Sequence, residues 1–326
     1  MNWLNRFATL VAACTWLLVI AGGLVTSTGS GLSVPDWPTT YGWSMFTFPL
    51  SKWAGGILYE HGHRLIASTV GMLTIVLAVW IWMKDTRPWV KALSLVALGA
   101  VITQGTLGGI TVLFQLPAPV SIGHAGLAQA FFCMIATIAL ATSRRWRDGY
   151  GGAPASALAA DLGLRRLAVV TTAVVYLQIL IGATVRHTGA GLAIPDFPLA
   201  FGGIVPPLGQ LANGPVAVHF AHRLVAVIAA ALIVVEAVRV YRHHRASPQL
   251  TRPALLLCVL VAVQITLGGF VVLTGRNVVV NTAHVANGAL TLVTSLVITL
   301  RAFRPVIHEV AGERAASIRA AAGYVA

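Results

Sequence analysis

Residues 28–38 read TGSGLSVPDWP and residues 188–198 read TGAGLAIPDFP, so one motif occurs twice at an offset of 160. The same offset relates QGTLGG at 104–109 to QITLGG at 264–269, and His124 to His284. EHGHRL at 60–65 matches HFAHRL at 219–224 at an offset of 159. Matches at four separate places indicate a tandem duplication. We expect its two halves at residues 1–155 and 156–326.

The composition predicts an integral membrane protein. Of the 326 residues, 57% are hydrophobic and only 10% are charged, and the mean hydropathy is +0.82. A soluble domain carries about 25% charged residues, so this chain has too few polar side chains to cover a water-facing surface. Disorder is excluded as well, because it requires low hydrophobicity and high charge.

Each half contains four apolar stretches long enough to cross a bilayer as helices. All fifteen prolines lie outside these stretches, as helix interiors require. The sequence therefore predicts an all-α integral membrane protein, whose eight transmembrane helices form two tandem, pseudo-symmetric four-helix bundles of the same orientation. The predicted spans cover residues 8–25, 65–84, 92–114, 121–143, 165–186, 218–241, 254–275 and 281–302.

The net charge of +13 has its explanation in membrane topology rather than in nucleic-acid binding. Seventeen of the 22 Lys and Arg residues fall in one alternating set of connecting segments, and five fall in the other. The positive-inside rule then places both termini in the cytoplasm and the long loops 26–64 and 187–217 outside. No organelle-targeting stretch precedes the first predicted helix, which favours a bacterial or archaeal plasma membrane.

Four of the ten histidines lie at the outer ends of the even-numbered predicted helices, at duplicated positions: His63, His124, His222 and His284. Ionisable groups at membrane depth are costly and mark function. Pairs of imidazoles on facing helices suit haem iron. A zinc or copper site, a proton relay and simple helix capping are the alternatives at this point. Pairing within each half or across the halves satisfies the symmetry equally well, and His187 and His219 have no assigned role.

The two halves differ one helical turn before these histidines. Glu60 precedes His63 by three residues, whereas the equivalent position in the second half is His219. A carboxylate near iron can move protons, so the first half is predicted to be reactive and the second to carry electrons. Arg64 and Arg223 follow their histidines directly, and either bind haem propionates or extend to the lipid headgroups.

The duplicated outer-loop motif is rich in Gly and Pro, which predicts a tight, ordered turn. It is either a lid over the histidine sites or a structural connector. Gly105 and Gly109 form a Gly-x-x-x-Gly pattern, for which we expect a close contact between helices.

The combination of Glu60-x-x-His63-Arg64, His124, His222-Arg223, His284 and the Pro-Asp-Trp-Pro loop resembles the haem A synthase family, over roughly residues 8–302. The resemblance implies oxidation of the C8 methyl group of haem O to a formyl group, giving haem A for cytochrome c oxidase. It implies that His63 and His124 bind the substrate haem, that Glu60 is the catalytic carboxylate, and that His222 and His284 ligate a haem b cofactor. The haems would lie toward the outer side, and haem O synthase and oxidase assembly factors would be partners.

Many family members carry a cysteine pair in the first outer loop, where this chain has Val34 and Thr40. A loop disulfide is therefore excluded here. Two other functions remain open from the residues alone. One is a di-haem, cytochrome b-type protein that oxidises quinol, and the other is a transporter with parallel repeats.

Overall fold

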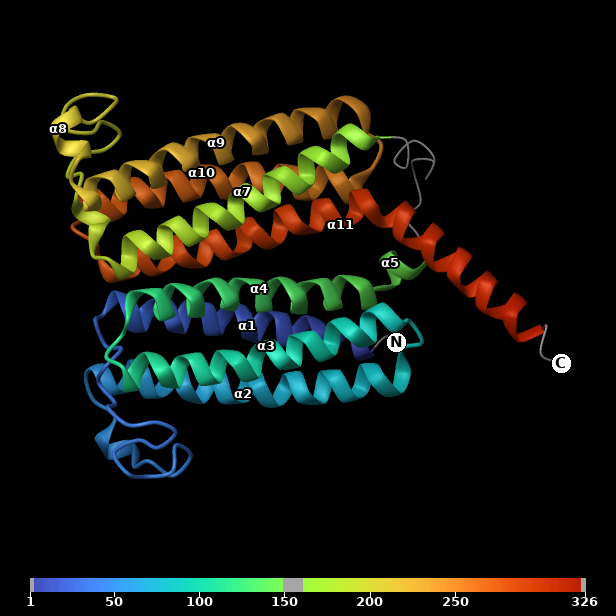
Figure 1. The fold of residues 1–326 in the computed structure, drawn as a ribbon, viewed down its shortest axis with the longest axis horizontal. Helices are drawn as coiled ribbons and strands as arrows, with labels where there is room; N and C mark the ends of the chain where they lie inside the picture. Colours follow the sequence, from blue (N-terminus) through green and yellow to red (C-terminus); the bar gives the residue numbers. More distant parts are fainter. Residues whose placement is uncertain (1–2, 149–160, 324–326) are drawn as a thin grey trace.

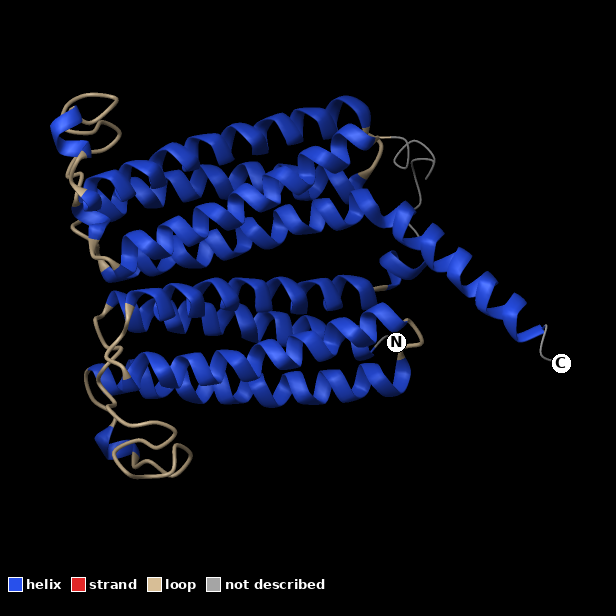
Figure 2. Ribbon diagram, viewed as in Figure 1, coloured by secondary structure: helices blue, strands red, loops and turns tan. Residues whose placement is uncertain are grey.

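The computed structural model describes the backbone of residues 3–148 and 161–323, and the side chains of residues 3–147 and 161–304. Within these ranges the chain forms helices, loops and two single β-bridges, without a β-strand (Figure 2). Eight of the described helices are long and apolar enough to cross a membrane. The predicted all-α membrane fold is confirmed.

The first half is a four-helix bundle of α1 (Trp3–Ser27), α2 (Gly56–Lys84), α3 (Pro88–Leu113) and α4 (Ala118–Thr142). Helix α1 packs against α2 and α4, and α3 packs against the same two helices. Helices α2 and α4 therefore occupy diagonal corners of the bundle. The short helices η1 (Leu50–Lys52) and α5 (Arg144–Asp148) lie at its two ends.

The second half repeats this arrangement with α7 (Leu162–His187), α9 (Gly214–His243), α10 (Pro248–Leu273) and α11 (Val278–Gly323). Here α9 and α11 occupy the diagonal corners, because each packs against both α7 and α10. The short η2 (Ala190–Leu192) and α8 (Leu208–Leu211) belong to its long loop. The backbone of α11 continues well past the end of the bundle (Figure 1).

The two bundles lie side by side, with α1 and α4 of the first facing α7 and α11 of the second (Figure 1). Both ends of the chain lie at one end of the molecule and both long loops at the other, as the predicted topology requires. The predicted boundary between the halves, at residues 155 and 156, lies outside the described residues.

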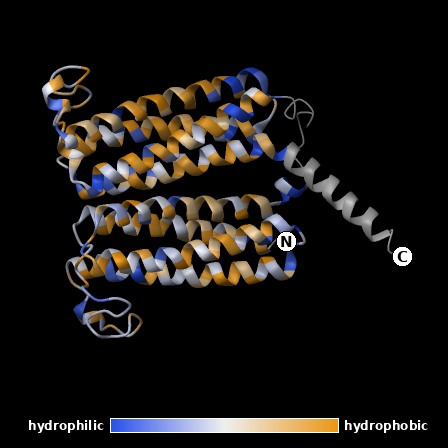
Figure 3. Cartoon of the chain, viewed as in Figure 1, coloured by the Kyte–Doolittle hydropathy of each residue, from blue (hydrophilic) through white to orange (hydrophobic). Residues whose placement is uncertain are grey.

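Hydrophobic residues predominate along most of the length of the helices in both bundles (Figure 3), and many large ones are exposed. Large side chains such as Ile102, 63% exposed, point away from the core. In water this surface would be strongly destabilising, whereas lipid acyl chains solvate it at no cost. Each half also has its own core, around Leu77 and Ile135 in the first and around Ile233 and Leu257 in the second.

The expected helix starts were wrong in two places. Helix α2 begins at Gly56, not near residue 65, so the first outer loop is shorter and His63 lies two turns inside the helix. Helix α10 begins at Pro248 and contains Pro253, which the expected span excluded. Proline leaves the carbonyl four residues earlier without its helical donor. Arg301 of α11 donates to that carbonyl, at Gln249, and so the proline is tolerated.

The duplication extends to the backbone of the tight turns. Between α3 and α4, Gln115 and Leu116 have φ of 57° and 60°. Between α10 and α11, Gly275 and Arg276 have φ of 62° and 67°. The Trp37–Pro38 and Phe197–Pro198 peptide bonds are both cis. Equivalent positions thus keep the same conformation although their residues differ.

Candidate functional site

The four duplicated histidines lie on the diagonal helices of their bundles. His63 is on α2 and His124 on α4, while His222 is on α9 and His284 on α11. His63 and His124 are close enough to interact electrostatically, and so are His284 and His222. Each half therefore brings its own two imidazoles toward one another across the bundle interior.

Every one of these imidazoles packs against a glycine on a neighbouring helix. A Cβ atom added at Gly22 of α1 would lie 3.0 Å from Cε1 of His63, and one at Gly182 of α7 would lie 2.9 Å from Cε1 of His222. Gly268 of α10 faces His284 in the same way, at 3.1 Å. Gly108 of α3 faces His124 at 3.5 Å. At Gly22, Gly182 and Gly268 a methyl group would crowd the ring, so glycine lets these three rings lie close to the adjacent backbone, whereas at Gly108 a methyl group would fit in ordinary contact.

Three of the four rings have a buried nitrogen without a partner in the protein: Nδ1 of His63, His124 and His284. Buried polar atoms are nearly always hydrogen-bonded or coordinated, so such atoms indicate a missing ligand or an ordered water. His222 differs, because Nε2 of Gln178 lies 3.0 Å from its Nδ1. Position 18, the counterpart of Gln178, is a leucine.

Glutamines on the neighbouring helices support the histidine backbone and rings. Gln104 of α3 donates to the carbonyl of His124 at 2.8 Å, and Gln178 of α7 donates to that of His222 at 2.9 Å. Nε2 of Gln264, the counterpart of Gln104, instead lies 3.3 Å from Nε2 of His284. These glutamines were missed in the sequence. The QGTLGG and QITLGG matches contained two of them, but were interpreted only as evidence of duplication.

Glu60 lies in the first half, buried at 3% exposure, one turn before His63. Its Oε2 accepts a hydrogen bond from the backbone N–H of Val34 at 2.8 Å. Its Oε1 accepts from Nη2 of Arg64 at 2.7 Å. The carboxylate is therefore held from two sides, by the outer loop and by the next turn of its own helix. Its orientation is therefore fixed one helical turn before His63.

His219 occupies the equivalent place in the second half. The N–H of Ile194 points at its Nδ1 over 3.3 Å, and Nε of Arg223 lies 3.3 Å from its Nε2. A neutral imidazole can accept at only one of these nitrogens. Glu60 and His219 thus share one structural task, attachment of the outer loop to the helix. The carboxylate makes the shorter, charge-assisted contacts.

Arg64 and Arg223 direct their guanidinium groups to loop carbonyls. Nη1 of Arg64 donates to the carbonyls of Asp36 at 2.7 Å and Thr39 at 3.0 Å. Nη1 of Arg223 donates to that of Leu199 at 2.8 Å, and its Nη2 to that of Asp196 at 2.8 Å. The role predicted for both arginines, binding haem propionates, stays a prediction, and their observed task is to fasten the loops.

The aspartates of the repeated motif close each loop into a turn. Asp36 accepts from the N–H groups of Tyr41 at 2.7 Å and Gly42 at 2.9 Å, and Asp196 accepts from Phe201 and Gly202, both at 2.8 Å. Burial raises the pKa of Asp36, but the hydrogen bonds outweigh it and keep the pKa below its ordinary value. The Gly202 N–H is the main cause of the lowered pKa of Asp196.

The aromatic residue of each loop motif lies at the level of the histidines. Trp37 packs on Gly109 of α3, where a Cβ would lie 2.5 Å from the indole, and Phe197 packs on Gly269 of α10 at 2.6 Å. The preceding glycines, Gly108 and Gly268, face His124 and His284. The expected helix contact of Gly105-x-x-x-Gly109 was wrong. Nothing described lies within 4 Å of a Cβ at Gly105, and Gly109 receives the loop tryptophan instead of a helix.

Arg186 joins the two halves at the histidine end and was not predicted. Its Nη2 donates to the carbonyl of Gly23 at 2.6 Å and to Oγ of Ser27 at 2.8 Å, both on α1. Its Nε is buried without a partner. Arg186 also interacts electrostatically with His187 and His284. The available sequence signal was a charge just inside an apolar span. Comparison of the two halves does not reveal it, because the position equivalent to Arg186 in the first half, position 26, is a threonine.

Residues 5–297 match the model of the COX15-CtaA family, described as a cytochrome oxidase assembly protein. The chain belongs to this family. A heme A synthase of Symbiobacterium thermophilum is 34% identical to it over 295 residues, which cover 87% of this chain and 90% of that protein. The heme A synthase of Halalkalibacterium halodurans is 32% identical over 286 residues, covering 86% and 91%. That of Alkalihalophilus pseudofirmus is 31% identical over 287 residues, again covering 86% and 91%.

The COX15-CtaA match includes both bundles and all four duplicated histidines. It does not rest on one half or on the loop motif alone. The resemblance inferred from the residues is therefore confirmed over most of the chain.

Proposed function

We propose that this COX15-CtaA protein binds its substrate haem O in the first half, between His63 and His124, and a haem b cofactor in the second, between His222 and His284. The reaction is that of the heme A synthases, conversion of haem O to haem A for cytochrome oxidase. The observation that supports the assignment of sites is the pairing of half-buried imidazoles across the diagonal of each bundle.

The residues present fit a haem better than a bare metal ion. Two imidazoles from opposite corners of one bundle would hold a haem iron between them. Among the described residues no group of three or more His, Cys, Asp or Glu side chains is placed to hold a metal ion, as a zinc site would need. The unpartnered ring nitrogens of His63, His124 and His284 are available for a ligand or its hydrogen-bonded surroundings.

The chemistry in the first half demands proton acceptance. Converting a methyl group and water to a formyl group releases four electrons and four protons. Glu60 is the carboxylate nearest along the helix to the substrate ligand His63, and its orientation is fixed by Val34 and Arg64. Acceptance of a proton by such a positioned carboxylate contributes typically about 10²–10⁴-fold to a rate. We assign this role to Glu60.

The second half serves as the electron-carrying side. A haem b bound there supplies reversible one-electron transfer. Gln178 restricts the orientation of His222, because its Nε2 lies 3.0 Å from Nδ1 of the ring and donates to the backbone carbonyl of His222 at 2.9 Å. His219 in place of Glu60 leaves this half without the carboxylate that the reaction uses. We also assign propionate binding to Arg64 and Arg223, shared with their loop carbonyls.

The histidine end faces the outer side of a plasma membrane in this proposal, because the arginine-rich connections lie at the opposite end. The isoprenoid tail of haem O favours entry from the bilayer. Haem O synthase and oxidase assembly factors would then act before and after this protein. The alternative function, a cytochrome that oxidises quinol, loses its support, because the relatives in this family are heme A synthases.

The test is product formation. The full chain is expressed in a bacterium that makes haem O but no haem A, and extracted haems are separated by chromatography. Haem A should appear only when the chain is present, and the purified protein should retain haem b. Retention of haem b with no haem A in an aerated, haem O-producing host would contradict the proposed function.

A further inference from the structure

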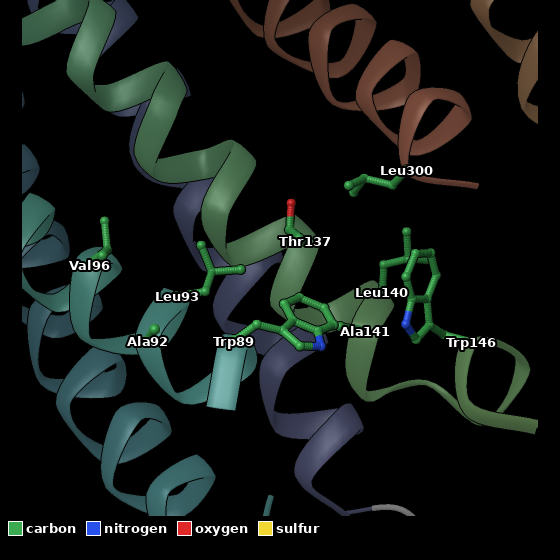
Figure 4. A pocket seen from close by; sticks show the side chains of 9 residues that line it. All are labelled: Trp89, Ala92, Leu93, Val96, Thr137, Leu140, Ala141, Trp146 and Leu300. Atoms are coloured by element: carbon green, nitrogen blue, oxygen red, sulfur yellow. The ribbon is translucent and has the colours of Figure 1, made fainter. Parts of the chain in front are cut away.

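An apolar pocket lies at the end of the molecule opposite the histidines, on the seam between the halves (Figure 4). Its volume is about 550 Å³. Helix α3 contributes Trp89, Leu93 and Val96, α4 contributes Thr137 and Leu140, and α5 contributes Trp146. Leu300 of α11 completes the wall from the second half. No part of the predicted reaction uses this pocket.

The exposed wall of the pocket is almost entirely apolar. Its one hydroxyl, on Thr137, donates to the carbonyl of Cys133 within the same helix at 2.7 Å. A cavity holds water only where two or more polar partners face it, so water does not suit this one. A hydrocarbon chain does suit it, and within a membrane such chains are the surrounding solvent.

Arginines lie beside both tryptophans of the pocket wall. Arg144, Arg145 and Arg147 are exposed and flank Trp146 on α5. The Arg87 guanidinium lies 5.6 Å from the ring centroid of Trp89, and that of Arg304 lies 6.0 Å from the ring of Trp146. Asp85 offsets part of this charge through Arg87, at 2.6 Å, and through Arg147, at 3.8 Å. Tryptophans beside arginines at a helix end are typical of the headgroup level of a bilayer.

From these observations we infer that the pocket binds an anionic glycerophospholipid, with an acyl chain between α3, α4 and α11 and its phosphate beside Arg144 and Arg145. Basic pockets between transmembrane helices on the cytoplasmic side commonly bind acidic headgroups. A second copy of this chain would present the same arginines and be repelled. A zwitterionic lipid would fill the pocket but leave the excess positive charge unbalanced. The inference does not depend on the proposed haem reaction.

The bound lipid would join the two halves. Leu300 belongs to the second half and every other wall residue to the first, so an acyl chain between them contacts both. Arg304 supports the same junction, because its Nε and Nη2 donate to the carbonyl of Trp146 at 2.9 and 2.7 Å. We therefore expect the lipid to raise the thermal stability of the whole protein.

The experiment is native mass spectrometry of the full-length protein released from vesicles of phosphatidylglycerol and phosphatidylcholine in equal amounts. The wild type should retain one phosphatidylglycerol in preference to phosphatidylcholine. Its unfolding temperature should rise when phosphatidylglycerol is added to phosphatidylcholine nanodiscs. Equal retention of the two lipids, retention of neither, or a dimer in place of a lipid adduct would overturn the inference.

Two variants and two matched controls locate the site. The double variant R144Q/R145Q should weaken phosphatidylglycerol retention by more than about tenfold, because each basic residue near an anionic headgroup contributes substantially. A92F, at an exposed position lining the pocket, should exclude the acyl chain. The control R242Q/R245Q removes the same charge from the same end of the second half, and L95F adds bulk to a lipid-facing position of α3. Both controls should behave as wild type, and equal loss in variants and controls would contradict the placement.

Discussion

Glu60 and His219 occupy the same place in the two halves and hold the same part of the outer loop, but they do so with different strength. Glu60 accepts from Val34 at 2.8 Å and from Arg64 at 2.7 Å. His219 meets Ile194 and Arg223 only at 3.3 Å, and a neutral ring accepts from one of them at most. A duplicated protein has thus kept the structural task in both copies while only one copy kept a carboxylate.

This comparison separates two roles of the residue at position 60, attachment of the outer loop and catalysis, which the sequence alone does not distinguish. Had Glu60 stood alone, its burial next to His63 would be sufficient grounds for a catalytic role. The counterpart His219 demonstrates that loop attachment alone already accounts for a polar residue there. The catalytic assignment therefore depends on what a carboxylate does that an imidazole does not, and variants that exchange the two residues measure it.

The largest expected effect comes from replacing the four histidines that we propose as haem ligands, one half at a time. H222A should remove haem b and leave haem O binding in the first half, whereas H63A should do the reverse, because each half pairs its own imidazoles. Haem content is measured from the optical spectrum and from extraction of the purified protein. Loss of both haems from H222A, with unchanged helical content by circular dichroism, would contradict pairing within the halves.

Exchange of the residues at position 60 sharpens the comparison directly. E60A should lower haem A formation by about 10²–10⁴-fold while haem binding persists, since it removes both the proton acceptor and the loop contact. E60H copies the second half and keeps an acceptor for Val34 without a carboxylate. It should be about as inactive as E60A but bind haem more like the wild type. An active E60H would show that attachment of the loop is the whole role of this residue.

Smaller effects are expected from replacing the glycines that pack against the histidine rings. G182A places a methyl group 2.9 Å from His222 Cε1, and G22A places one 3.0 Å from His63 Cε1, so each ring must shift. Displacing a ligand in this way should weaken haem binding in that half by about tenfold and alter its electron paramagnetic resonance spectrum. G105A is the matched control, because nothing described lies within 4 Å of its added methyl group. A control that perturbs the haem equally would mean that helix flexibility, not ring position, is responsible.

Arg186 tests the contact between the halves, where the first half has only Thr26 at the equivalent position. R186M removes two charge-assisted hydrogen bonds, to the carbonyl of Gly23 and to Oγ of Ser27. One hydrogen bond to a charged group is worth about 1.5–3 kcal/mol. The unfolding temperature in detergent should therefore fall. R276Q, at an exposed turn of the same end, should leave the unfolding temperature unchanged. Equal stability of R186M and the wild type would refute a role for Arg186 in joining the halves.

The smallest effect concerns the pH dependence of the two loops. The pKa of Asp36 and that of Asp196 both lie below the ordinary carboxyl value, so their ionised forms favour the folded turns. This stabilisation is complete above the unfolded pKa near 4 and is lost as the pH falls through the lower, folded pKa. Trp37 fluorescence should report loosening of the first loop at acid pH, and D36N should show it already at neutral pH. A D36N loop with unchanged fluorescence and protease resistance would contradict this role.

Much of the architecture was predictable because a bilayer permits few solutions. The length and hydropathy of the spans, the offset of 160 and the placement of arginines yielded eight helices in two like-oriented bundles. Helix starts were less predictable. Gly56 begins α2 two turns before the apolar run, because buried contacts of Glu60 and His61 replace lipid there. Pro253 lies inside α10 because a distant side chain, Arg301, compensates for it.

The site was predictable where the repeat preserved residue identity and less so where it did not. The four histidines were found because they recur. Gln178 and Arg186 were missed because their counterparts in the first half are Leu18 and Thr26, so a comparison of the two halves does not mark these positions as shared. The propionate role expected for Arg64 and Arg223 ignored the loop carbonyls, whose positions depend on the folded Pro-Asp-aromatic-Pro turns. No spacing in the sequence reveals where those carbonyls point.

The seam between the bundles is latched at both ends. Arg186 holds it beside the histidines through Gly23 of the first half, and at the other end Arg304 of α11 donates to the carbonyl of Trp146 of the first half. Contacts at both ends of the seam oppose a hinge motion that would separate the two bundles. In each bundle the adjacent helices with the least extensive packing are on the flank remote from the seam, α2 with α3 and α9 with α10. In the proposed function, haem O would therefore enter and leave the first bundle laterally from the lipid, between α2 and α3.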